Sequence, residues 1–467
     1  MRAFFMILTA ALLILPGCSG GSRQRNVAEV SRLQDLPAFS TDDLHRRTFN
    51  YFWELSDSVT GLVPDRYPTQ SFSSIAAVGF GLTAYLVGVE HDYISRQQAA
   101  VRVLKILRFF WSAPQGPGTT GITGYHGLFY HFLDMRTGYR FRDVELSTID
   151  TGLLMAGILS CMTYFDGDSP EEQEIRDLAD RLYRRAEWDW AFLGNHALSM
   201  GWHPESGFIN SYWDGYTEAM ILLVMAIASP THPIPASYWQ SRYAKFNWSN
   251  WYGYEHVNFG PLFGHQYSHI YIDFRDIRDE YMRSKGTDYF ENSRMATLAQ
   301  QAYGRANPLG FKGYSDSVWG LTACDGPGDE TREYNGRMVK FMGYAARGTA
   351  SDYQVDDGTI APTAAGGSIP FAPEICLATL ESIYNTFGNK VYREYGFIDA
   401  FNPSYTWGKG NEHGWFDVDY IGIDQGPILL MLENYRTGFI WTLMKRNPYI
   451  RDGLIKAGFT GGWLENK

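Results

Sequence analysis

Three carboxylates gather within eight residues of the stretch Arg142–Gly157. Asp143, Glu145 and Asp150 lie in R-D-V-E-L-S-T-I-D-T-G-L-L-M-A-G, which leads from a polar approach into an apolar helical run. Ser147 and Asp150 stand three residues apart, close to the Ser/Thr-x-x-acid spacing that caps a helix N-terminus. A capping role accounts for Asp150 as well as a catalytic one does, whereas Glu145 and Asp143 precede the cap. We therefore interpret this stretch as one side of an active site.

Other carboxylates recur where further apolar segments begin. Glu218 is predicted one turn inside such a segment, where a buried carboxylate is costly unless it has a task or an ion-pair partner. Hydrolysis of a glycosidic bond requires two carboxylates across a cleft, one to protonate the leaving oxygen and one to activate water or attack the sugar. The candidates are Glu145 as general acid, Asp143 and Asp150 sharing or tuning that role, Glu218 as second choice of acid, and Asp417 or Asp419 as base.

A pair of histidines offers a competing metal site. His265 and His269 stand at i, i+4 and would share one face of a helix, as two metal ligands do. The sequence H-Q-Y-S-H, however, lacks the glutamate of H-E-x-x-H. Binding of sugar hydroxyls by His265, Gln266 and His269, or burial of the histidines in the core, is favoured over a metal. Glycine-rich nucleotide motifs in a strand–turn–helix context are not found, so we expect neither a metal nor another cofactor.

The composition favours a carbohydrate ligand. The chain has a formal net charge of −11 and no basic cluster, which argues against nucleic acid as a partner. Aromatic residues make up 16%, and many lie in glycine-rich loops, where they could stack on the flat faces of neutral sugars. The alternative is that they pack these loops together. The aromatic and polar candidates for substrate binding are Trp213, Tyr216, Trp407, His413 and Trp415.

Helical segments of two kinds alternate along the chain. Segments with charge on one side are Asp42–Leu55, Ser95–Trp111, Ser169–Trp188, Pro235–Phe246 and Thr287–Arg305. More apolar ones are Ser74–Val89, Ser147–Tyr164, Tyr216–Ala228, His265–Tyr281, Phe371–Thr386 and Asp424–Tyr435. A helix that is apolar all round must be buried on all sides. The alternation therefore predicts an all-α, six-hairpin (α/α)6 barrel, whose sixth outer helix is Lys390–Tyr395 or Phe439–Met444.

Loop lengths give a second argument for this barrel. Connections that enter the apolar segments are long, and those that leave them are short, so the long loops should emerge on one face and carry the active site. Within one of them, Tyr125–Phe132 and Thr137–Phe141 alternate around Arg136-Thr137-Gly138 and predict a small β-hairpin. The small residues Ala361–Ile369 suggest a mobile edge of the cleft.

The first residues resemble a bacterial lipoprotein signal. Arg2, the apolar run Phe4–Leu15 and Leu15-Pro16-Gly17-Cys18 predict a signal peptide over 1–18 with lipidation of Cys18. An ordinary secretory signal is the alternative. We expect a tether over 19–38, a single catalytic domain over 39–467, and export to the outer membrane with attachment through the lipid alone.

Three stretches resemble a known family. E-L-S-T-I-D-T-G-L-L-M-A-G at Glu145–Gly157, G-P-L-F-G-H-Q-Y-S-H-I-Y-I-D-F-R at Gly260–Arg275 and Y-I-G-I-D-Q-G-P-I-L-L-M-L-E at Tyr420–Glu433 are similar to the glycoamylase-like domain of bacterial glycoside hydrolases. The resemblance implies an α/α barrel, inverting hydrolysis, and action on β-1,2-glucan or oligosaccharides such as sophorose. Two alternatives stay open: a glycan-binding lipoprotein without activity, and an α/α-barrel epimerase or polysaccharide lyase.

Overall fold

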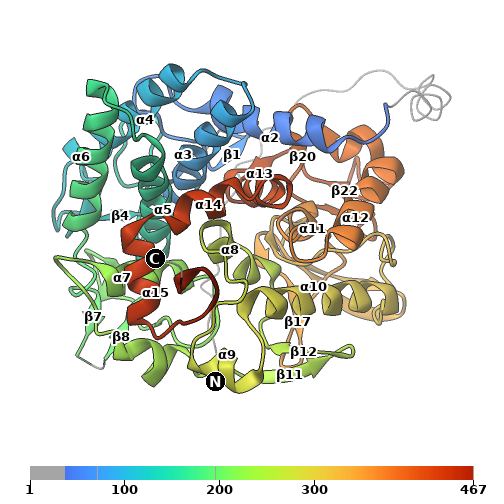
Figure 1. The fold of residues 1–467 in the computed structure, drawn as a ribbon. Helices are drawn as coiled ribbons and strands as arrows, with labels where there is room; N and C mark the ends of the chain where they lie inside the picture. Colours follow the sequence, from blue (N-terminus) through green and yellow to red (C-terminus); the bar gives the residue numbers. More distant parts are fainter. Residues whose placement is uncertain (1–36, 71, 195, 466–467) are drawn as a thin grey trace.

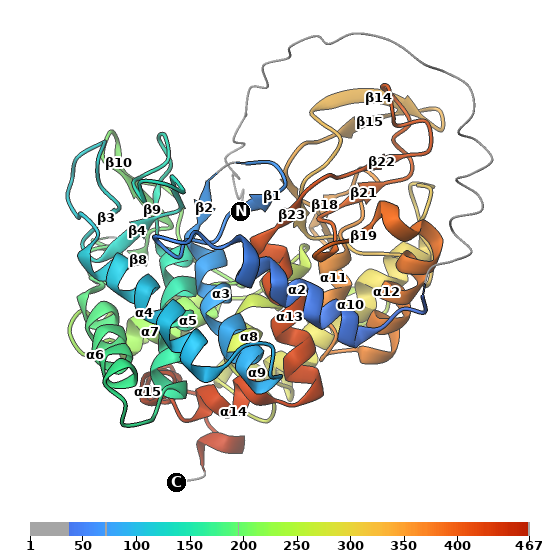
Figure 2. The ribbon, with the colours of Figure 1, turned by 90° about the horizontal axis from the view of Figure 1, so that it is seen from above.

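The computed structural model describes residues 37–70, 72–194 and 196–465. The predicted signal peptide, Cys18 and nearly all of the tether lie outside these residues. Within these residues, the helices form a ring, and the strands lie on one side of that ring (Figures 1 and 2). This architecture confirms the predicted (α/α)6 toroid.

Six buried helices form the inner ring. They are α3 (Ile75–Glu90), α5 (Thr148–Tyr164), α7 (Met220–Ala228), α8 (Tyr267–Tyr271), α11 (Pro362–Gly366) and α13 (Gly422–Arg436). α3 packs against both α5 and α13, and α7 joins α5 to α8. The Gln266 side chain then links α8 to α11 by donating to the Ala364 carbonyl at 3.0 Å, and α11 packs on α13, which closes the ring.

The outer layer is amphipathic, as its charge pattern predicts. It contains α2 (Thr41–Leu55), α4 (Arg96–Ser112), α6 (Pro170–Arg185), the π-helix η2 (Trp239–Tyr243), α9 (Glu280–Lys285), α10 (Tyr289–Ala306) and α12 (Pro373–Phe387). Side chains of Ser40, Ser95 and Ser169 cap three of these helices. After the ring, α14 (Phe439–Lys445) and α15 (Pro448–Lys456) lie at the end away from the strands (Figure 2). Short 3-10 turns occur at Leu262–His265 (η3), Gly388–Lys390 (η4) and Gly462–Leu464 (η5).

Several predicted helices differ from those observed. α12 belongs to the outer layer, since it exposes Glu374 and Glu381, and the buried α11 takes the inner place. The predicted mobile edge Ala361–Ile369 is therefore wrong: its small residues let α11 approach α13 closely. The helix predicted over His265–Tyr281 is broken: α8 ends at Tyr271 and α9 begins at Glu280. Between them, Asp273 accepts from the Arg275 N–H at 3.2 Å in a turn that competes with the helix.

Two further segments also depart from the prediction. Pro235–Phe246 forms mainly the π-helix η2. Neither predicted alternative for the sixth outer helix takes that place: Lys390–Tyr395 contains a strand, and Phe439–Met444 belongs to α14, which follows the ring. The last outer helix is α12, the α-helix that precedes the inner helix α13.

Strands cover the end of the ring where the inner helices begin (Figure 2). A five-stranded sheet has the order β10–β9–β6–β4–β3, formed by Gly207–Phe208, Gly201–His203, Leu146–Ser147, Leu128–Tyr130 and Gly124–Tyr125. The predicted hairpin is present, because Leu133 bridges Arg140 and the Phe141 N–H donates to the Phe132 carbonyl at 3.0 Å. The long loops therefore do share one face.

The other strands pair two by two. β1 (Arg66–Tyr67) pairs with β23 (Tyr420–Ile421), β2 (Ser73–Ser74) with β5 (Phe132–Leu133), β7 (Phe192–Leu193) with β8 (Ala197–Leu198), β11 (Trp248–Trp251) with β12 (Tyr254–Val257), β13 (Ala323–Cys324) with β16 (Ala345–Ala346), β14 (Glu330–Tyr334) with β15 (Arg337–Phe341), β17 (Gly348–Ala350) with β18 (Tyr353–Val355), β19 (Tyr392–Arg393) with β20 (Gly396–Phe397), and β21 (Phe401–Asn402) with β22 (Trp415–Phe416).

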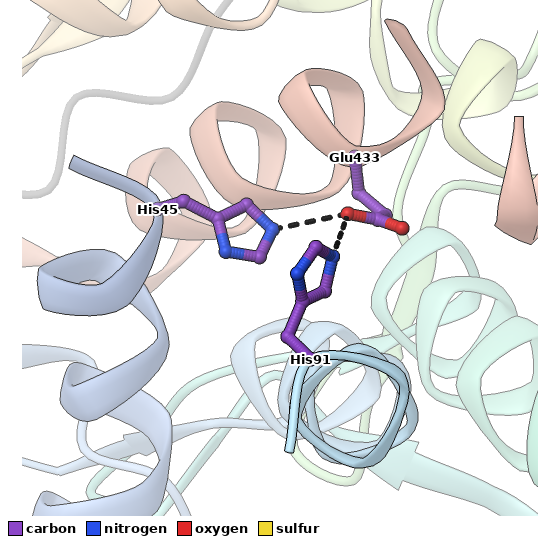
Figure 3. A group of neighbouring side chains, drawn as sticks. All are labelled: His45, His91 and Glu433. Carbon is purple, nitrogen blue, oxygen red and sulfur yellow. Dashed lines mark hydrogen bonds and ion pairs between the residues drawn. The ribbon is translucent and has the colours of Figure 1, made fainter. Parts of the chain in front are cut away.

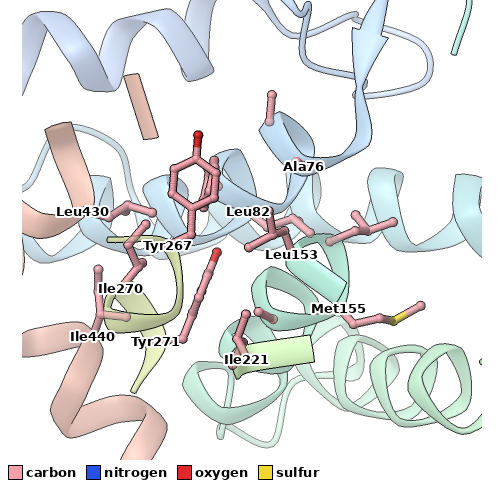
Figure 4. Packing of buried hydrophobic residues seen from close by; sticks show 14 of the residues in the cluster. Ala76, Leu82, Leu153, Met155, Ile221, Tyr267, Ile270, Tyr271, Leu430 and Ile440 are labelled. Carbon is pink, nitrogen blue, oxygen red and sulfur yellow. The ribbon is translucent and has the colours of Figure 1, made fainter. Parts of the chain in front are cut away.

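The core lies between the inner helices (Figure 4). At the contact of α3 and α5, a Cβ on Gly157 would lie 2.1 Å from the Gly79 carbonyl oxygen, so the two backbones touch. Tyr271 points into the same core, where its hydroxyl lies 3.4 Å from Thr83 Oγ1. None of the described helices combines the length and the apolar character that a membrane crossing requires.

Candidate active site

His131, Glu145 and Asp150 form the first group of titratable residues on the strand face. His131 follows β4, Glu145 precedes β6, and the pairing of these strands brings the two side chains together. His131 Nδ1 lies 2.8 Å from Glu145 Oε1, and its Nε2 lies 3.5 Å from Asp150 Oδ1. Burial lowers the pKa of His131, but the charges of Asp150 and Glu145 outweigh it and raise that pKa to about 9. His131 is therefore an imidazolium at neutral pH.

This imidazolium acts differently on its two carboxylates. Burial opposes ionisation of Glu145, but the charge of His131 and its hydrogen bond hold the pKa of Glu145 below its usual value. For Asp150, burial dominates and raises the pKa despite His131. Ser147 caps α5 by accepting from the Asp150 N–H at 3.2 Å, as its spacing predicts, and its Oγ donates to Asp150 Oδ2 at 2.5 Å. Glu145 is thus ionised and a poor proton donor.

Glu218 is the carboxyl best suited to donate a proton. It lies two residues before α7 rather than one turn inside it, and Ser268 Oγ donates to its carbonyl oxygen at 2.6 Å. Burial raises the pKa of Glu218 to about 7, and the charge of Asp150 adds to the shift. Since the side chain is half-buried rather than enclosed, Glu218 combines a raised pKa with access to solvent.

A second group consists of Asp325, Asp399, Asp417 and Asp424. Asp325 directly follows β13, Asp399 precedes β21 and Asp417 follows its partner β22, and Asp424 lies in the first turn of α13. Asp399 Oδ2 accepts from the Asp325 N–H at 2.7 Å. Donor atoms of Asp325, Asp399 and Asp417 all lie within 4.8 Å of one another.

The aspartate group contains more carboxyls than it can ionise. Burial is the main cause that raises the pKa of Asp417 to about 8 and that of Asp424 to about 7. It also raises the pKa of Asp399 well above its usual value, and a hydrogen bond joins the Asp399 and Asp424 carboxyls. Burial raises the pKa of Asp325 as well, but Arg66 opposes this shift, because its Nη1 lies 2.6 Å from Asp325 Oδ2. Arg66 also contacts Asp65 at 3.1 Å.

Two tyrosines join the groups. The pKa of Tyr267 is raised well above its usual value by burial and then by Asp424, Glu218 and Asp150, so its phenol lies between the two sets of carboxyls. Tyr344 is 50% exposed, yet burial raises its pKa too, followed by Asp424 and Asp399. Groups that water reaches, but that protein surrounds on most sides, line a cleft. We infer from these shared neighbours that the two carboxyl groups face a common cleft on the strand side of the ring.

Several predicted substrate-binding residues lie in the core instead. His265 and His269 are fully buried; His265 Nε2 bonds the Phe259 carbonyl at 3.2 Å, and His269 Nε2 lies 3.1 Å from Ser293 Oγ. Gln266 connects α8 to α11. The Tyr216 ring packs on the His265 ring, with their centroids 4.8 Å apart. These surroundings match the alternative of core histidines, and they do not bring His265 and His269 together as metal ligands.

The other predicted residues divide between the cleft wall and the surface. Trp213 is buried and donates to Thr148 Oγ1 at 2.8 Å, which fixes the start of α5. Asp419 accepts from the Thr69 N–H at 2.8 Å. Asp143 and His413 are exposed. Trp407 packs on Phe341 in a separate small cluster, and Trp415 lies on β22 next to it.

Sequence reasoning missed His131, Arg66, Asp325 and Asp399. Each lies in a loop or a two-residue strand and has no spacing motif, and their partners come from distant segments. The sequence offered only weak signals for these residues. His131 lies near the end of the first strand of the predicted hairpin, and Asp325 and Asp399 follow short apolar runs.

A match to a family model covers residues 210–448, about half of the chain; the model, named Glycoamylase, carries the description "Putative glucoamylase". A curated relative is the exo β-1,2-glucooligosaccharide sophorohydrolase (non-reducing end) of Parabacteroides distasonis, with 30% identity over 450 residues that cover 89% of this chain. The chain spans only 57% of the length of that relative.

Solved structures are similar over nearly the whole chain. A Bacteroides uniformis protein, described as a "putative glucoamylase", is 34% identical with a TM-score of 0.79, covering 92% of this chain and 100% of its own. The endo-β-1,2-glucanase of Chitinophaga pinensis, solved with sophorotriose and glucose, is 30% identical with a TM-score of 0.76, covering 91% and 100%. Together with the ring of helices and the carboxyl-lined cleft, these matches show that the chain belongs to the glycoamylase family.

Proposed function

We propose that this protein is a glycoside hydrolase that cleaves β-1,2-linked glucan or gluco-oligosaccharides with inversion. The observation that carries the proposal is Glu218: a half-buried carboxyl with a pKa raised to about 7, facing a cleft that holds a second group of carboxyls. A protonated and an ionised carboxyl across a cleft are the minimum that glycosidic hydrolysis needs.

In this mechanism, Glu218 is the general acid. Its raised pKa keeps a large share of the carboxyl protonated at neutral pH, so it can donate to the leaving glycosidic oxygen. Glu145, our sequence-based candidate for this role, is instead ionised and orients His131, whose imidazolium holds a positive charge beside Asp150.

The base comes from the aspartate group. Asp325 is the first candidate: burial raises its pKa, but Arg66 opposes that shift, whereas burial raises the pKa of Asp417 to about 8 and that of Asp424 to about 7. An ionised Asp325 can take a proton from the attacking water. For inversion, the working carboxyls must leave room for that water, at a separation of about 6.5–9.5 Å.

A neutral sugar fits the lining of the cleft. One carboxyl oxygen of Asp417 is buried and has no hydrogen-bond partner among the described residues, which makes it a candidate acceptor for a sugar hydroxyl. Tyr344 offers a half-exposed ring for stacking. The β-1,2 linkage is proposed from the printed activities of the sophorohydrolase and the endo-β-1,2-glucanase.

The test is product analysis with linkage-defined glucans. We expect wild-type protein to release reducing sugar from β-1,2-glucan or its oligosaccharides but not from β-1,3- or β-1,4-glucan, with the inverted anomer visible by NMR at early times. Glu218→Gln and Asp325→Asn should each lower kcat by about 10²–10⁴-fold. Asp143→Asn, which changes an exposed carboxylate on the same face, is the control and should retain activity.

Three outcomes would overturn the proposal. Activity retained by Glu218→Gln removes the assigned acid. Binding of β-1,2-glucan without release of reducing sugar makes the protein a glycan-binding protein. Unsaturated products with ultraviolet absorbance indicate a lyase.

We also propose attachment to the membrane through a lipid on Cys18, on the strength of the lipobox-like Leu15-Pro16-Gly17-Cys18. Expression of the full chain with a clickable palmitate analogue tests this proposal. Wild-type protein should incorporate the label and partition into detergent, and Cys18→Ser should do neither; equal labelling of the two would contradict it.

A further inference from the structure

His45, His91 and Glu433 point toward one another (Figure 3), where α3 and α13 end. His45 lies on α2, His91 caps the C-terminus of α3, and Glu433 lies near the C-terminus of α13. Asp424 of the cleft lies in the first turn of α13, nine residues before Glu433, which separates the two sites by about 13 Å along the helix axis.

The donor atoms of this cluster have the composition and spacing of a metal site. His45 Nε2 lies 3.1 Å from Glu433 Oε2, and His91 Nε2 lies 2.7 Å from the same oxygen. Two imidazole nitrogens and a carboxylate are a common ligand set for Zn²⁺, whose ligands lie about 2.0–2.2 Å from the ion and hence about 3.3 Å from one another. His91 Nε2 and Glu433 Oε2 would have to move apart by about 0.6 Å to admit the ion.

Outer contacts orient these ligands. Tyr93 Oη lies 3.0 Å from His45 Nδ1, and Thr437 Oγ1 donates to Glu433 Oε1 at 2.6 Å. Such partners fix the ring orientation and the tautomer of metal-binding histidines. When His45 Nδ1–H donates to the Tyr93 oxygen, Nε2 is left with a lone pair for the metal.

Charge and access also fit a cation. Of the nearby guanidinium groups, Arg436 is paired with Asp42 at 2.5 Å and Arg46 lies 3.9 Å from the Tyr93 ring centroid. His91 is 21% exposed and gives an ion a path from solvent.

We propose that His45, His91 and Glu433 bind a divalent transition-metal ion such as Zn²⁺, with water as the remaining ligand, and that the ion fastens α2 to α3 and α13. The site is structural, since it joins three helices and lies away from the carboxyl cleft. Its occupation should therefore change stability but not hydrolysis.

The test titrates Zn²⁺ into full-length protein that carries no histidine tag and has been stripped with EDTA. Wild-type protein should bind one Zn²⁺ per chain by calorimetry and elemental analysis, and its Tm should rise by several degrees. His91→Ala and Glu433→Gln should weaken binding at least about tenfold and abolish the rise. Co²⁺ should give a visible absorption band in wild-type protein that both variants lack.

His232→Ala is the matched control, since His232 is also a partly exposed histidine paired with a carboxylate, Asp189, at 3.2 Å. It should bind Zn²⁺ like wild-type protein. If wild-type protein takes up no Zn²⁺, or if the cluster variants bind it as tightly as the control, the three residues form only a hydrogen-bonded triad and the proposal falls. Hydrolysis measured alongside separates this result from a failure of the proposed function.

Discussion

At the scale of single residues, the cleft shows how environment sets the role of a carboxyl. Glu145 and Glu218 are both glutamates at the mouth of an inner helix. Glu145 contacts the His131 imidazolium at 2.8 Å and is ionised. Glu218 has the like charge of Asp150 nearby and is held protonated by burial. The sequence favours Glu145 as acid because it precedes a cap, but the spacing of residues does not reveal which carboxyl has a cation beside it.

We predict that ionisation of the half-buried Glu218 carboxyl lowers the free energy of unfolding above about pH 5. Its pKa rises from 4.5 to about 7 on folding, so the native state binds more protons than the unfolded state between these values, and stability falls as pH rises through this window. Glu218→Gln should therefore be more stable than wild-type protein at pH 8, by up to about 3 kcal/mol, and equal to it near pH 4. Urea denaturation at the two pH values measures this. An equal gain at both would show that ionisation of Glu218 is not the cause.

His131 should stabilise the fold in a different window. Its pKa is raised from 6.5 to about 9, so its contribution is complete below pH 6.5 and is lost as pH rises through about 9. His131→Gln should lower the unfolding midpoint at pH 6 and remove most of the decline between pH 7 and 9.5. The exposed His413→Gln is the control. A decline of unchanged size in His131→Gln would contradict the assigned ion pairs.

At the scale of elements, the closest contact in the ring is between α3 and α5. Their backbones touch because Gly79 and Gly157 face one another without side chains. The other end of α5 carries Asp150 and the cap Ser147, so the packing of these two glycines also fixes one wall of the cleft.

Gly157→Ala should therefore destabilise the protein by about 1–3 kcal/mol, because the added Cβ would lie 2.1 Å from the Gly79 carbonyl oxygen and backbone cannot move aside as a side chain can. Gly116→Ala is the control, since its Cβ would meet nothing within 4 Å. Thermal or urea unfolding compares the two. Similar midpoints would show that the helices separate at no cost.

At the scale of the whole molecule, a large insertion with six strands, β13 to β18, lies between α10 and α11. It contains Asp325, the proposed base. One buried ion pair holds it together: Arg347 Nε lies 2.8 Å from Asp357 Oδ1, with both side chains fully buried. Arg347 also donates to the carbonyl oxygens of Cys324 at 2.8 Å and Asp325 at 3.3 Å. The position of the proposed base therefore depends on Arg347.

Arg347→Met should cost about 3–5 kcal/mol of stability, because it leaves Asp357 buried without a cation. It should also lower kcat more than it raises KM, since it loosens Asp325. Arg332→Met, which removes an exposed partner of Glu330, should leave both stability and kcat nearly unchanged. Equal effects in the two variants would contradict this assignment.

The sequence predicts the ring well and the cleft only in part. Long helices such as α3 and α5 are apolar all round, so burial on every side follows from their pattern. α8 and α11 have only five residues each, too few to show a period; the prediction extended α8 to Tyr281 and placed α12 in the inner ring instead of α11. The cleft depends on contacts such as Arg66 with Asp325, which lie 259 residues apart and leave no local signal.

The closure of the ring has a consequence for how the chain folds. Glu433 reaches His45 across 388 residues, so the last inner helix must be synthesised before the first has a neighbour on both sides. Folding that depends on contacts between such distant residues is slow. Until α13 packs against α3, one apolar face of α3 stays exposed to solvent. A circular permutant that links α15 to α2 and opens a loop elsewhere should turn this late step into an early, local one and refold faster.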